Sequence, residues 1–175
     1  MKKIPKPKPG EYPAYAEMYM KWLPDDSLIL EHLKSNFQMI KDFIYQLSSD
    51  KLFYRYAPGK WTIKEILVHI VDDERIYAYR AMAFARNEQQ SLPGFDQDSY
   101  AIYSEANDRN LENIFEEYEA VRNATIALFN GLPDNSFSRM GTGSSIHQRA
   151  TVRALVYHIA GHELHHINFI RENYL

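Results

Sequence analysis

Four segments of this chain repeat apolar residues at the three- and four-residue spacing of an α-helix, and this periodicity limits the folds open to it. The first segment, for example, carries Leu30, Leu33 and Phe37 on one face. No segment shows the strict alternation of apolar and polar residues that indicates a half-buried strand. The predicted helices cover residues 26–48, 62–86, 110–130 and 151–173, after a Pro- and Tyr-rich extended arm at 1–24. The pattern predicts a single all-α domain (1–175) folded as a four-helix bundle.

The connection between the second and third predicted helices is long enough to decide the topology. It comprises 23 residues, Asn87–Arg109, and an extended stretch of that length spans about 75 Å. A helix of about 24 residues is only about 36 Å long, so the connection can lead the chain back along the whole bundle. We therefore expect an up-down-down-up bundle, with a long crossover between helices two and three and with these two helices parallel.

Composition excludes several classes of protein. Hydrophobic residues make up 45% and charged residues 25% of the 175 residues, which is typical of a globular domain. The formal net charge is −3 and Lys and Arg are scattered, so we expect no nucleic-acid partner. Residues 1–10 lack the apolar run of a signal peptide, and no stretch reaches transmembrane length, so we expect a cytoplasmic protein without a membrane partner. Cysteine is absent, so any metal must be bound by His, Asp, Glu or water.

The most informative stretch is His162-Glu-Leu-His-His166, near the C-terminus. Its first and last histidines are four residues apart, so on a helix they lie on one face about one turn apart and can reach the same metal ion. They also continue the apolar stripe of Leu155 and Ile159, where a core-facing residue belongs. A polar side chain at such a position needs a partner, and a metal ion would supply one. We therefore predict a site for one divalent metal ion at this pair.

A third ligand is available on the second predicted helix, where His69 lies seven residues after the helix cap Thr62. His166 lies about seven residues before the predicted end of the last helix. If these two helices are antiparallel, His69, His162 and His166 lie at the same level of the bundle; if they are parallel, the levels are offset. Three neutral imidazoles without a fourth protein ligand leave a position open for water or substrate, which is typical of catalytic sites.

The same stretch also matches His-Glu-x-x-His, the zinc-protease motif in which the glutamate, here Glu163, is the general base. The longer metzincin form of that motif needs Gly at 169 and His at 172, but the chain has Phe169 and Glu172. We therefore do not expect a protease.

Four residues are candidates for contacting and orienting the ligands without binding the metal: Asp72, Asp73, His158 and Glu163. The two aspartates follow His69 by three and four residues and could hold its ring, or they could pair with arginines on the helix surface. A fourth protein ligand from His158 or Glu163 would instead close the site and make the metal a structural pin.

Two stretches resemble the signature segments of the DinB/YfiT-like superfamily. They are Trp61-Thr-Ile-Lys-Glu-Ile-Leu-Val-His69 with the following Asp72–Arg75, and Gly161-His-Glu-Leu-His-His166. Tyr56–Trp61 and Leu92–Asp98 extend the resemblance over nearly the whole chain. It implies a four-helix bundle with a His-only metal site, often filled by zinc or nickel. The superfamily's ligands fall on His69, His162 and His166. Some members transfer small thiols such as bacillithiol to electrophiles, and others are described only as metal-dependent hydrolases.

Spacing and resemblance together predict a metal-dependent enzyme that binds one zinc or nickel ion per chain and activates water or a small thiol. Its reaction would be that of a hydrolase or of a thiol S-transferase. A small-molecule substrate is the expected partner, with a low-molecular-weight thiol among the candidates, and a homodimer is left open. The alternative is a non-catalytic metal-binding bundle with a structural or sensor role, or an interaction bundle whose histidines bind nothing.

Overall fold

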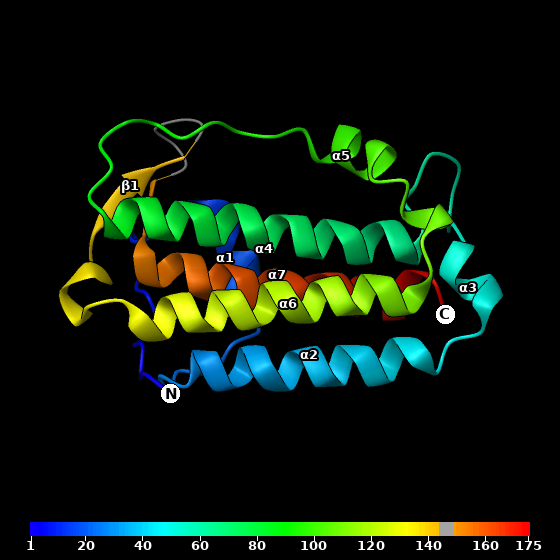
Figure 1. Cartoon of the computed structure of the whole chain (residues 1–175), viewed down its shortest axis with the longest axis horizontal. Helices are drawn as coiled ribbons and strands as arrows, with labels where there is room; N and C mark the ends of the chain where they lie inside the picture. Colours follow the sequence, from blue (N-terminus) through cyan, green and yellow to red (C-terminus); the bar gives the residue numbers. More distant parts are fainter. Residues whose placement is uncertain (144–148) are drawn as a thin grey trace.

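The computed structural model describes residues 1–143 and 149–175, and it confirms the predicted all-α four-helix bundle (Figure 1). The long helices are α2 (Ile29–Tyr45), α4 (Ile63–Ala85), α6 (Leu111–Gly131) and α7 (Val152–Asn173). Helices α2 and α7 run in one direction and α4 and α6 in the other, with a crossover along the outside of the bundle between α4 and α6. The topology is therefore up-down-down-up, as predicted.

Side-chain caps explain where three of these helices begin. At α4, the Thr62 hydroxyl accepts a hydrogen bond from the Glu65 backbone N–H, and the Glu65 carboxylate accepts one from the Thr62 N–H. This is the capping box that the sequence predicts. Asn110 caps α6 and Thr151 caps α7 in the same way, each accepting a bond from the backbone N–H three residues later.

Helix α2 begins later than predicted. The expected start was near residue 26, but Ser27 has a φ of 64°, in the left-handed region, and the helix begins at Ile29. The Asp26 side chain accepts a hydrogen bond from the Leu28 N–H, so Asp26 stabilises a turn before the helix rather than capping its first turn.

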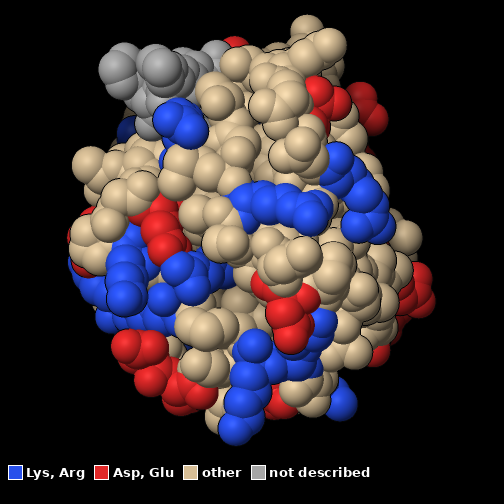
Figure 2. Space-filling view, turned by 90° about the vertical axis from the view of Figure 1, so that its left-hand side faces the viewer, with Lys and Arg blue, Asp and Glu red and all other residues tan. Residues whose placement is uncertain are grey.

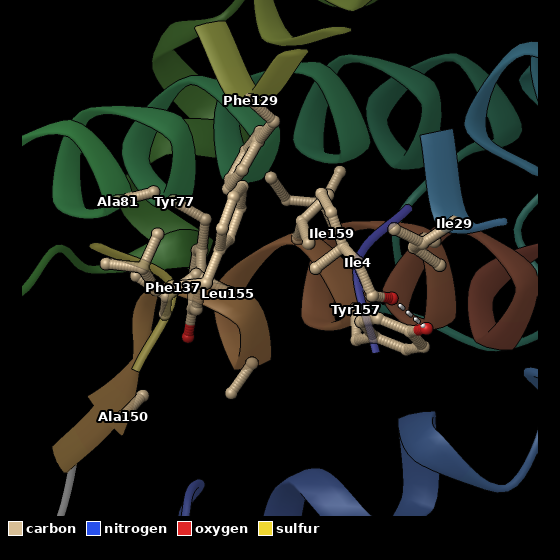
Figure 3. Packing of buried hydrophobic residues seen from close by; sticks show 14 of the residues in the cluster. Ile4, Ile29, Tyr77, Ala81, Phe129, Phe137, Ala150, Leu155, Tyr157 and Ile159 are labelled. Atoms are coloured by element: carbon tan, nitrogen blue, oxygen red, sulfur yellow. Dashed lines mark hydrogen bonds between the residues drawn. The ribbon is translucent and has the colours of Figure 1, made fainter. Parts of the chain in front are cut away.

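Two clusters of buried apolar side chains fill the bundle, one toward each end. The first joins the starts of α2 and α7 to the ends of α4 and α6, and Figure 3 shows part of it, including Phe129, Leu155 and Ile159. The second lies around the start of α4 and the end of α7, with Ile66, Ile70 and others. His69 and His162 therefore lie between the two apolar clusters along the length of the bundle.

The N-terminal arm packs against α7, but it is not extended throughout. It contains the 3₁₀ turn η1 (Ala14–Ala16) and the short helix α1 (Glu17–Met20). Near its start, the backbone C=O of Ile4 accepts a hydrogen bond of 2.9 Å from the Tyr157 hydroxyl, drawn as a dashed line in Figure 3. Gly161 of α7 lets α1 approach closely, because a Cβ there would lie 2.5 Å from the backbone oxygen of Tyr19.

Short elements complete the connections. They are α3 (Ser49–Phe53), α5 (Gln97–Tyr103), η2 (Ala106–Asp108), η3 (Asp134–Ser136), β1 (Met140–Thr142) and β2 (Arg149–Thr151). The two strands pair antiparallel, Gly141 opposite Ala150, so the prediction of no strand was wrong for this hairpin. Each strand has only three residues, too few to show an alternating pattern of apolar and polar residues.

The surface carries charges of both signs. Figure 2, which views the end of the bundle nearest the hairpin, shows Lys and Arg interspersed with Asp and Glu rather than gathered into one basic patch. Within the described residues, no helix combines the length and apolar character needed to cross a membrane.

Candidate metal centre

Three histidines converge between the two apolar clusters. His69 comes from α4, and His162 and His166 come from α7. The Nε2 atom of His162 lies 3.1 Å from that of His69 and 3.0 Å from that of His166. One ring nitrogen from each residue lies within 4.8 Å of the other two. Because α4 and α7 are antiparallel, the three predicted ligands reach the same level of the bundle.

Aromatic rings pack on both sides of the cluster. The Trp61 ring lies 4.8 Å from that of His69, between centroids, and the Tyr19 ring of α1 meets His162 edge-on at 5.5 Å. His69 and His162 are each only 5% exposed, whereas His166 is partly exposed. The cluster is therefore buried except on the side of His166.

Burial sets the charge of these rings. Loss of solvent lowers the pKa of His69 below its ordinary value, and the nearby imidazoles add to burial in lowering the pKa of His162 and His166 well below it. The three imidazoles are therefore neutral at pH 7. Neutral imidazole is the form that binds a metal, so burial keeps the three rings in the protonation state that a metal site needs.

The two short nitrogen separations, from His162 to His69 and from His162 to His166, fit a shared metal ion. Two ring nitrogens bound to one metal at about 2.1 Å lie about 3.0 Å apart at a right angle and about 3.4 Å apart at a tetrahedral angle. The observed separations of 3.1 and 3.0 Å correspond to the first case. A hydrogen bond can join only two of the three Nε2 atoms through one proton, while a cation can satisfy all three lone pairs at once.

Asp73 and His158 lie directly behind His162. The Oδ2 atom of Asp73 is 3.4 Å from Nδ1 of His162 and 3.3 Å from Nε2 of His158. The His158 ring stacks on Tyr77 with a centroid separation of 3.7 Å and an interplanar angle of 3°. His158 thus faces the carboxylate, and it is not a member of the three-histidine cluster.

The two aspartates that follow His69 lie in different surroundings. Asp72 lies 3.6 Å from Arg75 in a helix-surface ion pair, the alternative that the sequence left open. Asp73 is the buried one, at 4% exposed, and its carboxylate meets His162 and His158 rather than the predicted His69.

Glu163 points away from the histidines. It is 0% exposed, and its carboxylate accepts hydrogen bonds from Tyr118, Arg122 and Asn36. Arg122 also bonds to the carboxylate of Glu74, with Nε–Oε1 at 3.0 Å. This arrangement leaves Glu163 unable to serve as the general base of a His-Glu-x-x-His protease or to hold a histidine ligand.

The buried ion network of Glu74, Tyr118, Arg122, Glu163 and Asn36 was not anticipated from the sequence. One signal was present, because Arg122 follows Tyr118 by four residues and so lies on the apolar face of α6. Its partners, however, come from α2, α4 and α7, and only the packing of all four helices brings them together.

Two cavities flank the histidines. The larger, about 580 Å³, reaches His166 and is lined by aromatic and apolar side chains, such as Trp61, Ile102, Phe169 and Tyr174, together with charged ones, Arg55, Lys60, Glu65 and Asp98. The smaller, about 200 Å³, lies on the side of His162 that faces Asp73 and His158. Helix α5 borders both cavities and the residues just before it border the smaller one, so the crossover forms part of the site.

Similarity to known proteins agrees with this geometry. The DinB superfamily profile matches residues 32–170, most of the chain and all three histidines. The chain belongs to the DinB superfamily. It is 23% identical over 145 residues, 81% of each chain, to a protein of Oceanobacillus iheyensis proposed to be a metal-dependent hydrolase.

Among solved structures, the DinB-superfamily fold recurs in YfiT from Bacillus subtilis, described as a probable metal-dependent hydrolase with an unusual four-helix bundle topology. The TM-score is 0.73 at 17% sequence identity, and the match covers 95% of this chain and 90% of that one. The resemblance noted from the sequence is thereby confirmed for family and fold.

Proposed function

We propose that this protein is a metal-dependent hydrolase that holds one divalent ion through His69, His162 and His166. The observation that carries the proposal is the convergence of three neutral imidazoles, with Nε2 of His162 3.1 Å from that of His69 and 3.0 Å from that of His166, beside a cavity large enough for a small molecule. The names of the Oceanobacillus and Bacillus relatives support the reaction class.

The donor set narrows the choice of metal. Three imidazoles without thiolate or carboxylate favour zinc or nickel over magnesium and calcium, which prefer oxygen ligands. When bound at a site with an open position, such an ion lowers the pKa of a coordinated water or thiol and so supplies a nucleophile near neutral pH. Neither His158 nor Glu163 is placed to close the site, because the first faces Asp73 and the second belongs to the Arg122 network.

The chain's own residues would bind and orient the substrate. Trp61, Ile102 and Phe169 offer apolar and aromatic surface in the larger cavity, from which water is displaced on binding. His165 lines the same cavity, and burial lowers its pKa, so its imidazole is neutral at pH 7 and able to accept a proton from a reacting group. These features suit a small molecule with an apolar portion.

The first test is the metal content of protein purified without a nickel column, measured by elemental mass spectrometry. We expect about one zinc or nickel ion per chain in the wild type. His162→Ala or His166→Ala should release it, because two ligands are too few to hold the ion against water. His165→Ala is the matched control: it removes a neighbouring histidine outside the cluster and should retain the metal.

Full metal occupancy in a protein carrying both His162→Ala and His166→Ala would refute the ligand assignment. The reaction is tested next, by screening metal-loaded wild type against ester, amide and phosphoester substrates and for conjugation of small thiols to electrophiles. Turnover in the hydrolysis screen that disappears with His166→Ala supports the proposal. Turnover only in the thiol screen would replace hydrolysis with thiol transfer at the same site.

A further inference from the structure

A buried carboxylate oxygen lacks a hydrogen bond beside the histidine cluster. Asp73 is 4% exposed, and its Oδ2 atom has no hydrogen-bond partner of good geometry among the described residues. The Nε2 atom of His158, also buried, is in the same condition. Buried polar atoms are rarely left in this state, so each such case calls for a physical explanation.

The two orphaned atoms face each other, and a third group faces them. Oδ2 of Asp73 lies 3.3 Å from Nε2 of His158 and 3.4 Å from Nδ1 of His162. These separations are close to hydrogen-bond length but have poor alignment. A small turn of the Asp73 carboxylate, with the His158 ring held in place, would bring Oδ2 into line with these N–H groups.

His162 is the ring on which this matters. Its Nε2 faces the other two histidines, and its Nδ1 faces Asp73. A neutral imidazole carries one proton, which sits on either nitrogen, and only the nitrogen without it can bind a metal. A carboxylate at Nδ1 holds the proton there and leaves the Nε2 lone pair directed into the cluster.

His158 restrains the carboxylate from the other side. Its ring is fixed against Tyr77 by face-to-face stacking at 3.7 Å, and Tyr19 packs edge-on at 4.9 Å. With its ring position fixed, His158 can donate from Nε2 to Asp73 but cannot follow the carboxylate if that moves. It therefore keeps Asp73 turned toward His162.

We propose that Asp73 is a positioning residue for the metal centre: it fixes the tautomer and ring orientation of His162, and His158 holds it in place. This inference rests on the proposed function, because it assigns how one of the three proposed ligands is prepared. It also separates Asp73 from its neighbour Asp72, which pairs with Arg75 at the surface.

The experiment compares Asp73→Leu with Asp72→Leu. Leucine keeps the branching of aspartate at Cγ but carries no acceptor, so Asp73→Leu removes the contact to His162, and Asp72→Leu is the control one residue away with the same increase in bulk. Zinc affinity is measured by competition with a chromogenic chelator. We expect Asp73→Leu to weaken binding 10- to 100-fold, and Asp72→Leu to leave the dissociation constant unchanged within about twofold.

A second readout does not depend on the metal. Nitrogen-15 NMR of metal-free protein distinguishes the two tautomers of histidine, and we expect the His162 proton on Nδ1 in the wild type and a mixture of tautomers in Asp73→Leu. If Asp73→Leu fails to fold, Asp73→Asn serves instead, because it keeps an acceptor but loses the charge; about tenfold weaker zinc binding is then expected.

Unchanged zinc affinity in a folded Asp73→Leu or Asp73→Asn protein would overturn the inference, as would a wild-type His162 that carries its proton on Nε2. A wild type that binds neither zinc nor nickel would instead refute the proposed function. The tautomer measurement would still decide whether Asp73 controls His162, so the two failures are distinguishable.

Discussion

Two buried polar clusters lie on different sides of α7, and two adjacent residues of that helix belong to them. His162 enters the histidine cluster, while Glu163 enters the network around Arg122. Neighbouring residues on a helix point about 100° apart, so the two side chains reach different spaces. Both clusters are almost fully buried, with His162 at 5%, Glu163 at 0% and Arg122 at 2% exposed. The difference between them is how their polar atoms are satisfied.

The Arg122 network supplies its own partners. The guanidinium bonds to Glu74, Glu163 and the backbone C=O of Leu33, and Tyr118 and Asn36 complete the bonding of Glu163. The histidine cluster has no such closure, because its nitrogens face one another. A polar cluster that satisfies itself contributes to structure, and one that needs a cation indicates a binding site.

The largest effect should come from breaking the Arg122 network. Arg122→Met removes the only cation within it and leaves Glu74 and Glu163 buried without their charge partner. We expect a loss of about 3–5 kcal/mol in the free energy of unfolding, measured by urea denaturation of metal-free protein. Zinc binding by the protein that remains folded should change little, because no metal ligand is touched.

A companion variant sharpens this test. Replacing Glu74, Arg122 and Glu163 together by Leu, Met and Gln removes all three charges, so no uncompensated ion remains. Such replacements of buried ion networks are often neutral or stabilising, and we expect the triple variant to be more stable than Arg122→Met alone. A loss below about 1 kcal/mol in Arg122→Met would show that the network contributes little to the fold.

Removing the metal ion from the histidine cluster should affect stability in another way. Metal binding stabilises the folded state by RT ln(1 + [L]/Kd), about 4 kcal/mol at a thousandfold excess of metal over Kd. We expect metal-free protein to keep its helical circular dichroism at room temperature, since the two apolar clusters do not involve the metal, and to melt at a lower temperature. Helical signal that collapses on chelation would favour the structural-pin alternative.

The sequence predicted what depends on local pattern. Helical periodicity, the Thr62–Glu65 capping box and the length of the crossover were enough for the bundle and its topology. The three histidines were predicted from spacing within each helix together with that topology, because antiparallel helices with a known start and end align their residues. Their convergence in space follows, although their role as ligands stays a proposal.

The rest depends on contacts between helices that no local pattern reveals. Asp73 follows His69 by one turn, which suggests that it contacts that ring, but the packing of α7 turns it to His162. Glu163 matches a protease motif, yet its direction is decided by Arg122 on another helix. The short helix α1 could not be foreseen either, because its four residues are ordered by packing on α7 at Gly161.

A substitution at Gly161 tests how much the packing of α1 contributes to stability and to the histidine cluster. An added methyl group would meet the backbone oxygen of Tyr19 at 2.5 Å, so Gly161→Ala must displace α1. We expect a net loss of about 1–3 kcal/mol in the free energy of unfolding, with weaker zinc binding as Tyr19 leaves the His162 ring. Gly131→Ala is the control, since a methyl group there has open space. A Gly161→Ala protein more stable than wild type would contradict this account of the arm.

The smallest expected effect is the pH dependence of metal-free protein, and the two clusters contribute with opposite signs. Burial lowers the pKa of His69, His162 and His166, so below about pH 6.5 the unfolded chain binds more protons than the folded one and stability falls as the pH falls. Burial raises the pKa of Glu163, so the folded state keeps this proton at pH values where the unfolded chain has lost it. This contribution to stability therefore falls as the pH rises from the unfolded pKa of Glu163 to its folded pKa.

Comparing wild type with a variant that lacks the three histidines isolates their contribution to the pH dependence of stability. In a protein with His69, His162 and His166 all changed to Gln, Glu163 and every other titrating group remain and cancel in the comparison with wild type. For three imidazoles with an unfolded pKa of about 6.5 that stay neutral when folded, wild type should lose about 1 kcal/mol more than the variant between pH 7.5 and 6.5. Urea denaturation of both metal-free proteins across this interval gives the difference directly. Equal slopes would mean that the folded cluster takes up protons as readily as the unfolded chain, and the cluster would then be far more solvated than its burial indicates.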